Sequence, residues 1–195
     1  MTGFIKSILY SFMPAGSENI ILHFSITIKH ALMKSLFLVL LFPVFAFGQR
    51  QESFGKFNLP DGANIRGTST VRGYERQLEV SNLIGTPAGN NTTIRLQIPT
   101  CDAVGSFRNL LNTKQRLRNG EIAVTVPGEK RKLDYRIVMQ DITVEECVDA
   151  EGQTTLQLKA GRIGWIYYTT DRRGKSAILS KAGWDEAKND VWTEF

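Results

Sequence analysis

A cluster of acidic side chains is the part of this sequence that comes closest to a catalytic or metal site. Four carboxylates surround Cys147 between two predicted strands: Glu145, Glu146, Asp149 and Glu151. Paired carboxylates can act as general acid and base, as in glycosidases. The D-x-D-x-D-G spacing of a calcium loop is missing, however. Because an acidic hairpin turn is far more often a solvated loop, we predict no catalytic residue, no metal and no cofactor.

Three aromatic residues are the second candidate for a binding function. Trp165, Tyr167 and Tyr168 could stack on a sugar ring. They lie on a predicted strand at nearly alternating spacing, where aromatic side chains usually pack in a core or an interface. We therefore interpret them as core and interface residues.

The histidines and cysteines narrow the chemistry further. Both histidines, His23 and His30, precede the region that we expect to be mature, which removes Ser-His and Cys-His nucleophile pairs and most zinc sites. Cys101 and Cys147 stand far apart and form no C-x-x-C motif. In an oxidising compartment they can form a disulfide, or they can remain two small buried residues. The sequence leaves both alternatives open.

Residues 33–48 have the features of a Sec signal peptide. The segment begins with Met33 and Lys34, continues as an apolar run, and ends with Ala46 and Gly48 at the positions that a signal peptidase prefers. The apolar run is too short to cross a bilayer as a helix, although an uncleaved anchor or a buried strand is an alternative. We therefore predict a secreted or periplasmic protein with no stable membrane anchor after processing.

Residues 1–32 are apolar and lack a turn or cap pattern. A signal peptide that begins at Met33 should have no such leader. The simplest explanation is that translation starts at Met33 and that residues 1–32 are upstream sequence read in frame; the alternative is a membrane segment. We found no linker or repeat in residues 49–195 and predict a single domain there.

The charge argues against a nucleic-acid partner. The chain has 24 Lys and Arg against 19 Asp and Glu, a net charge of +5. This balance is only mildly basic, and no basic stripe with interleaved aromatic residues follows the sequence.

Alternation of apolar and polar residues dominates the remaining chain and predicts half-buried strands. It is clearest in residues 74–80, 93–98 and 121–126. Two longer strands change the parity of their apolar residues, one near Gln140 and Asp141 and one at Gly161. A bulge or kink at each change would keep the apolar face on the core. Such strands are typical of a curved or closing sheet.

One segment has helical spacing instead. Val104, Phe107, Leu110, Leu111 and Leu117 predict a helix between the third and fourth strands. Asp102 is its expected N-cap, Asn119-Gly120 its expected stop, and Arg116 and Arg118 lie near its end. The tail residues Trp184, Ala187, Val191 and Phe195 also have helical spacing and predict a short amphipathic turn docked on the domain. The predicted fold class is all-β with one helix, a small barrel or sandwich.

Particular residues stand at the joints between these elements. Tyr135-Arg136-Ile137 is followed by Asp141-Ile142-Thr143-Val144, then by Ile163-Gly164-Trp165-Ile166-Tyr167, and finally by Gly183-Trp184-Asp185. The complete set of motif residues is Gly67, Ser69, Glu79, Asp102, Tyr135, Asp141, Trp165, Tyr167, Asp171, Gly183 and Trp184. In this order the set resembles the Hcp (haemolysin-coregulated protein) family of type VI secretion, over roughly residues 54–192.

The resemblance implies a two-sheet β-barrel with a flanking helix, of the phage-tail-tube type. It implies a non-catalytic protein whose main partner is itself, in a homo-hexameric ring that stacks into a tube. It also implies small effector proteins in the lumen and other secretion components as partners.

Two features depart from the family pattern. Hcp proteins are loaded from the cytoplasm and need no signal peptide, and their long loop between the second and third strands is short here, at residues 84–91. We expect a ring-forming tube component or a secreted carrier related to the type VI secretion system. The alternative is a secreted or periplasmic binding module that keeps the fold without forming a tube, and the size of the native particle separates the two.

Overall fold

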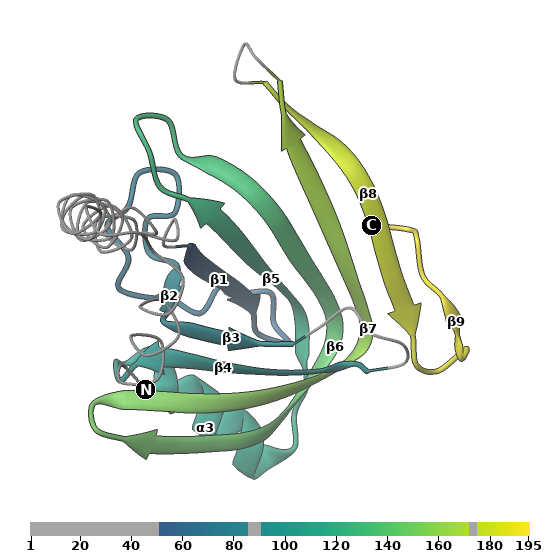
Figure 1. Cartoon of the computed structure of the whole chain (residues 1–195). Coiled ribbons are helices and arrows are strands. Elements are labelled where there is room, and N and C mark those ends of the chain that lie inside the picture. The colour runs from purple at the N-terminus through teal and green to yellow at the C-terminus, as the bar shows by residue number, and fades with distance from the viewer. Residues whose placement is uncertain (1–50, 86–90, 172–174) are drawn as a thin grey trace, which may run out of the picture. The chain divides into compact units, whose positions relative to one another are not determined.

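The computed structural model describes residues 51–85, 91–171 and 175–195 (Figure 1). The predicted leader, the predicted signal peptide and most of the loop at residues 84–91 lie outside the described residues. They therefore stay predictions. No helix in the described ranges is long and apolar enough to cross a membrane.

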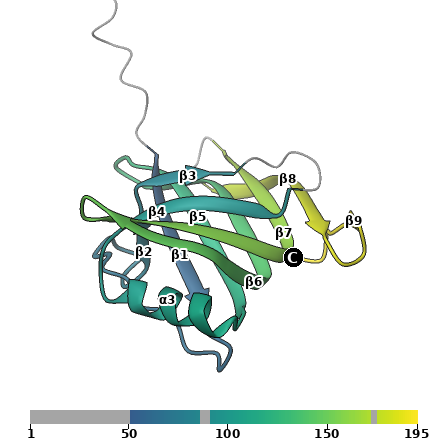
Figure 2. The same cartoon turned by 90° about the horizontal axis from the view of Figure 1, so that it is seen from below.

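The described residues form nine strands and one helix, in agreement with the predicted fold class. In chain order they are β1 (Glu52–Asn58), β2 (Leu78–Val80), β3 (Asn82–Ile84), β4 (Thr93–Pro99), α3 (Ala103–Thr113), β5 (Leu117–Val126), β6 (Lys132–Ala150), β7 (Gln153–Thr170), β8 (Ser176–Asp185) and β9 (Asp190–Val191). The helix lies between the strands that contain residues 93–98 and 121–126, as predicted, and packs against β6 (Figure 2).

A single antiparallel sheet connects all the strands. Its order is β2-β1-β5-β6-β7-β4-β3, with β8 on β7 and β9 on β8. The two ends of this order are consecutive in the chain, because only Ser81 separates β2 from β3. The Ser81 N–H donates to the Gln97 carbonyl at 2.9 Å. One extended segment therefore pairs first with β1 and then with β4, and so links the two edges of the curved sheet.

The two parity changes predicted from the sequence face each other in the β6–β7 hairpin. Asp141 has a φ of 53°, and a Cβ on Gly161 would lie 3.2 Å from the Asp141 Cβ. Gln140 pairs with Arg162 and Ile142 pairs with Ala160, so the register is the same on both sides of the kink. The hairpin bends here without slipping, and its two halves contribute to different parts of the sheet (Figure 1).

The core lies between the inner face of this sheet and the helix. Val104, Phe107 and Leu110 are buried, as the helical spacing predicted, and the Phe107 ring meets the Phe57 ring edge-on with centroids 5.6 Å apart. Burial of each such side chain contributes about 1.5–3 kcal/mol.

The helix ends earlier than its apolar spacing indicated. It stops at Thr113, and Lys114 adopts the left-handed conformation that often ends a helix. Leu117 is instead the first residue of β5 and pairs with Ile142. The predicted stop at Asn119-Gly120 is therefore wrong, and Arg116 and Arg118 do not lie at a helix end. The segment from Leu117 joins the sheet and does not extend the helix, because Leu117 becomes fully buried in β5.

The tail is also not helical. Trp184 lies in β8 opposite Ile163, Val191 lies in β9 and is 64% exposed, and Trp192 is buried instead. The tail docks on the sheet, as predicted, but it does so as a hairpin. The segment that contains Trp184 forms a strand and not a helix because it pairs with the edge of β7, and β9 then pairs with β8.

Candidate functional site

The acidic residues around Cys147 lie at the turn end of the β6–β7 hairpin. Glu151 and Gly152 connect β6 to β7 with φ values of 51° and 76°, the signs of a two-residue type I′ turn. Arg95 pairs with Glu146 at 3.0 Å, and Gln157 donates to Glu145 at 2.9 Å. Glu145 and Glu146 are thus separated from the turn and engaged with neighbours on the sheet.

Asp149 is held by two partners across the same hairpin. The Thr154 hydroxyl donates to its carboxylate at 2.8 Å, and Arg108 of the helix forms an ion pair with it. These two hydrogen bonds lower the pKa of Asp149 below its ordinary value. Among the described residues no group of three or more His, Cys, Asp or Glu side chains is placed to bind a metal. The structure therefore assigns these acids to a turn that also fixes the helix.

The two cysteines are free thiols in the structure, both half-buried against the core. Burial raises the pKa of the Cys147 thiol, although Arg108 nearby opposes the effect. The disulfide between Cys101 and Cys147 stays a prediction.

The aromatic residues on β7 occupy distinct environments. Trp165 is 4% exposed and belongs to the core. Tyr167 lies 5.8 Å from Tyr135 across the β6–β7 pair, and Arg136 covers the Tyr168 ring at 5.9 Å. Burial is the main reason that the pKa of Tyr135 is raised. Because these rings already have protein neighbours, they form no open platform for a sugar.

Gly67 and Ser69 hold together the loop that leads into β2. A Cβ on Gly67 would lie 2.2 Å from the Gln77 carbonyl oxygen, so only glycine fits. Ser69 is buried, and its N–H donates to the same carbonyl at 3.1 Å. Their motif position therefore has a structural explanation. Asp102 stands at the helix N-cap, although its side chain makes no capping hydrogen bond.

The motif residues near the end of the chain also lie at joints. Asp171 accepts a hydrogen bond from the Lys175 N–H at 2.8 Å at the base of the β7–β8 connection. Asp185, the third residue of the Gly183-Trp184-Asp185 motif, is almost fully buried and pairs with Arg162 at 2.7 Å. Burial tends to raise the pKa of Asp185, but hydrogen bonds from the Lys188 N–H and Arg162 outweigh it, so that the pKa is lowered.

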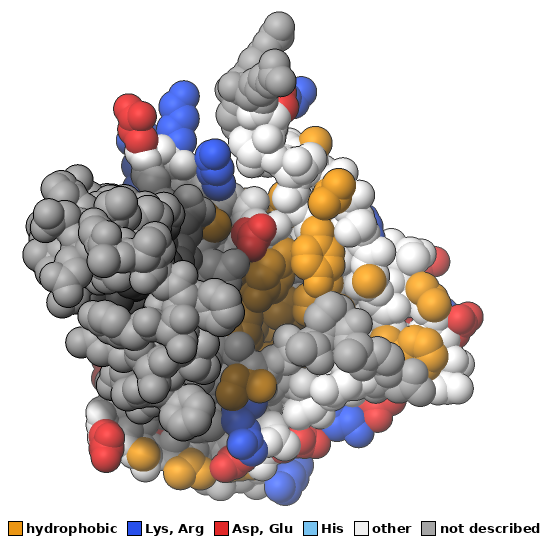
Figure 3. Space-filling view, viewed as in Figure 1, with side chains coloured by type: hydrophobic (Ala, Val, Ile, Leu, Met, Phe, Trp, Pro, Cys, Tyr) orange, Lys and Arg blue, Asp and Glu red, His pale blue; other side chains and the backbone are white. Residues whose placement is uncertain are grey.

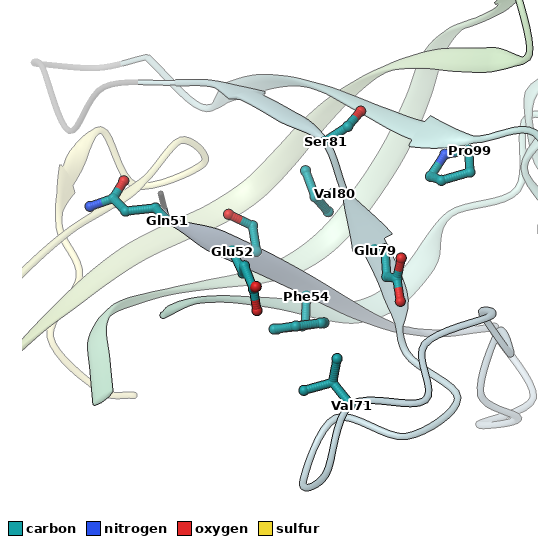
Figure 4. A pocket seen from close by; sticks show the side chains of 9 residues that line it. Gln51, Glu52, Phe54, Val71, Glu79, Val80, Ser81 and Pro99 are labelled. Atoms are coloured by element: carbon teal, nitrogen blue, oxygen red, sulfur yellow. The ribbon is translucent and has the colours of Figure 1, made fainter. Parts of the chain in front are cut away.

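A pocket of about 320 Å³ opens beside the place where the chain crosses from β2 to β3. Figure 4 shows Phe54 and Val71 facing each other at its floor, with Glu52 and Glu79 on either side. Tyr74 stacks on the Phe54 ring at 4.5 Å, and Arg131 lies 5.4 Å from the same ring. Arg131 also pairs with Glu52. Both the ring and one of the two carboxylates are therefore engaged within the chain.

The most exposed part of the sheet is β8. All residues from Ser176 to Ala182 are exposed, including Ile178 at 55% and Leu179 at 68%. Hydrophobic side chains follow the course of β7 and β8 in Figure 3. In the described part of the chain β8 pairs with β7 on one side, and on the other side it meets only β9, near its end. Most of one edge of β8 is therefore open.

A second open edge lies at β3, where Ile84 is 59% exposed. Within the described residues β3 pairs only with β4. Open edges with apolar side chains are templates for pairing with another chain. We therefore regard β8 and β3 as the candidate functional site, an assembly surface. Sequence reasoning missed it, because a strand exposed on both faces shows no alternation.

The comparisons with known proteins agree with this fold. No protein-family model and no curated protein matches the sequence. Among solved structures, a type six secretion system protein has a TM-score of 0.62 at 16% identity, and 73% of this chain covers 100% of that chain. Hcp1 from Salmonella typhimurium has a TM-score of 0.59 at 16% identity, with 73% and 99% covered.

A third neighbour is the secreted protein Hcp3 from Pseudomonas aeruginosa. Its TM-score is 0.54 at 14% identity, with 74% of this chain and 100% of that chain covered. These likenesses span the full length of the Hcp chains. They confirm the Hcp-type fold that the motif order predicted.

Proposed function

We propose that this chain is a non-catalytic structural protein of the Hcp type: a ring-forming tube component or a secreted carrier related to the type VI secretion system. The observation that carries the proposal is the pair of open strand edges on a sheet with the Hcp fold. The full coverage of the Hcp chains supports it.

The geometry of the two edges favours a ring over a two-fold dimer. β8 and β3 occupy different places in the strand order; β8 carries the exposed apolar side chains of Ile178 and Leu179, and β3 carries that of Ile84. A contact between β8 of one copy and β3 of the next is heterologous, and such contacts generate rings when the rotation closes. By the resemblance to Hcp, six copies are expected, with the lumen available to small effector proteins.

The location of the protein belongs to the same proposal. Residues 33–48 support export to the periplasm or the medium, where a ring would act as a carrier outside the cytoplasm. Exported protein should then begin at Gln49, and intact-mass analysis of material collected outside the cytoplasm tests this start site. A soluble exported species that retains Met33 would contradict it.

The native particle size tests the ring. After expression of the full chain, the purified protein should elute as a closed oligomer by light scattering and appear as rings in negative stain. A monodisperse monomer at micromolar concentration would instead favour the alternative, a secreted or periplasmic binding module that has kept the fold without a tube.

Matched variants locate the contact. Ile178→Lys and Leu179→Lys place charges on the open edge of β8 and should convert rings to monomers, because a charge at an edge blocks pairing. Val148→Lys changes a side chain of similar exposure, 50%, on the β6–β7 hairpin and should leave the rings intact. Equal dissociation by all three variants would argue against β8 as the contact.

A further inference from the structure

A row of cross-strand neighbours runs over the outer face of the sheet from β1 to β8, and its last two positions are glycines. Cross-strand neighbours connect Lys56 to Glu121, Glu121 to Val138, Val138 to Gly164, and Gly164 to Gly183. The residues that flank Val138 along β6 are inner-face side chains of the core, so this row points outward. The two glycines leave its β7–β8 end without side chains.

The tail fills that end of the row. A Cβ on Gly164 would lie 2.5 Å from the Phe195 ring, and a Cβ on Gly183 would lie 2.8 Å from it. The Trp192 ring packs against Phe195 with centroids 4.6 Å apart. Lys181 lies 5.1 Å from the centre of the Phe195 ring. The two aromatic rings therefore form an apolar wall across the row.

The row continues beyond this wall as an open pocket of about 320 Å³ over β1, β5 and β6. Trp192 and Phe195 line one side of it, and Asn58 and Lys56 line the other. The side-chain oxygen of Asn58 is buried and has no hydrogen-bond partner among the described residues. That oxygen is closed off from the pocket, so the pocket offers a ligand the apolar wall and the side chains of Lys56 and Glu121. Glu121 is paired with Arg136 at 3.0 Å.

A second pocket of about 360 Å³ adjoins the first and shares Lys56 with it. Asn58 is bridged to Asn64, which lines this second pocket. Arg66 and Arg76 are also part of its lining. Within the described residues, Lys56, Arg66 and Arg76 form no ion pair, whereas six other basic side chains do.

One carboxylate, Glu75, also lines the second pocket. It accepts a hydrogen bond from the Gly73 N–H at 2.9 Å, and hydrogen bonds from the backbone of Glu75 and Gly73 lower its pKa. Glu75 is thus engaged by its own loop, and across the two pockets the three cations outnumber Glu75 and Glu121. Arg76 is held at a φ of 59°, and its N–H donates to the Ser69 carbonyl at 2.8 Å, so its backbone is fixed.

We propose that these joined pockets bind an extended acidic segment of a partner protein. Its carboxylates would meet Lys56, Arg66 and Arg76, and an apolar side chain would pack on Phe195. Charge complementarity selects the acidic partner, and the apolar wall selects a peptide over a plain anion. The surface lies outside the β8 and β3 edges, so the proposal does not depend on ring formation.

Fluorescence anisotropy on the full chain tests the proposal. The probe is a fluorescein-labelled peptide of one phenylalanine followed by four glutamates. The triple variant Lys56→Gln, Arg66→Gln, Arg76→Gly should bind it about tenfold more weakly. Glycine accepts the positive φ at position 76 without strain. Binding should also weaken as salt is added, because the cations are exposed.

The matched control removes three exposed cations elsewhere, with Lys130→Gln, Lys132→Gln and Lys188→Gln, and should leave binding unchanged. A phenylalanine peptide with four lysines should not bind. Equal binding by both triple variants would overturn the proposal. So would inorganic polyphosphate that binds as tightly as the peptide and loses affinity in the same variant, because the surface would then be a general anion site.

Discussion

Glycines decide where large aromatic side chains can lie on this sheet. A Cβ on Gly120 would lie 2.6 Å from the Phe57 ring, and Gly164 and Gly183 leave space for Phe195. The first contact lies in the core and the second on the outer face. Each glycine is needed for close approach, since none of the three has a positive φ.

Two glycine substitutions distinguish a glycine needed for close approach from a glycine that only lowers helix propensity. Gly183→Ala should destabilise the protein by about 1–3 kcal/mol, because the new methyl would lie 2.4 Å from the Trp192 carbonyl. Gly105→Ala in the helix meets open space and should stabilise by about 0.5–1 kcal/mol. Thermal unfolding of both variants checks the prediction, and a neutral Gly183→Ala would show that the tail is loosely docked.

The ion pair of Asp185 and Arg162 should make stability depend on acid pH. The pKa of Asp185 is lowered on folding, so its contribution is present above the unfolded value of about 3.9 and is lost as the pH falls through the folded value. Asp185→Asn should therefore be less stable than the parent at pH 7, and the gap should narrow below about pH 4. The exposed Glu129→Gln serves as the control in urea unfolding. A gap that is constant with pH would mean that packing, and not charge, explains the loss.

At the residue scale, the sequence predicted where motif residues lie better than it predicted which side chains they contact. The motif order placed Gly67, Ser69 and Gly183 at joints, and the structure shows why the two glycines have no room for a side chain. Nothing in the sequence indicated that Asp185 would meet Arg162, or that Lys56 and Arg66 would share a pocket. Those pairs form because strands distant in the chain lie side by side, which a local pattern does not report.

The β6–β7 hairpin turn is not built from the best residues for its conformation. Its two turn residues both have positive φ, and Glu151 is the first of them. Asparagine tolerates this conformation better than glutamate does. Glu151→Asn should therefore stabilise the protein by roughly 0.5–1 kcal/mol, whereas Glu151→Val should destabilise it. Chemical denaturation measures both, and equal stability of the two variants would contradict the turn assignment.

At the element scale, most buried strands were predictable and the exposed ones were not. The strand predicted at residues 74–80 was wrong over its first part, because the chain turns at residues 74–77 and β2 covers only Leu78–Val80. The parity changes at Asp141 and Gly161 were visible because one face of each strand must stay apolar. β8 gave no such signal, since Ser176 to Ala182 are exposed on both faces. The end of the helix was misplaced because Leu117 fits the helical spacing and the β5 register equally well. Only its pairing with Ile142 decides between them.

At the scale of the whole molecule, one extended segment connects two parts of the sheet, because its β2 part pairs with β1 and its β3 part pairs with β4. β2 and β3 are short, and neither would be stable as part of an isolated hairpin. Together they join β1 to β4 through Ser81, whose hydroxyl also donates to Gln153 at 2.9 Å. This link is long-range and could not be read from the sequence, although the family resemblance implied the closed shape.

The last prediction is that the protein forms rings but stacks them poorly. Rings need the strand edges, and these are present at β8 and β3. Stacking needs a separate head-to-tail surface, which by the resemblance to Hcp includes a long loop whose counterpart here is the connection between β3 and β4. That loop is short here, at residues 84–91, most of which lie outside the described residues. Loss of its contacts should weaken stacking and leave the ring contact unchanged, because the two surfaces are distinct.

Negative-stain imaging of the purified full chain checks this prediction, with the β8 variant Leu179→Lys as the control for ring loss. Single rings and short stacks are expected for the parent, even at high concentration. Lengthening the loop with a flexible insertion should not restore stacking, since added length without specific contacts only raises the entropy of ordering the loop. Long tubes formed by the parent would contradict the prediction, because a short loop would then suffice for the head-to-tail contact and the protein would assemble as an ordinary tube component.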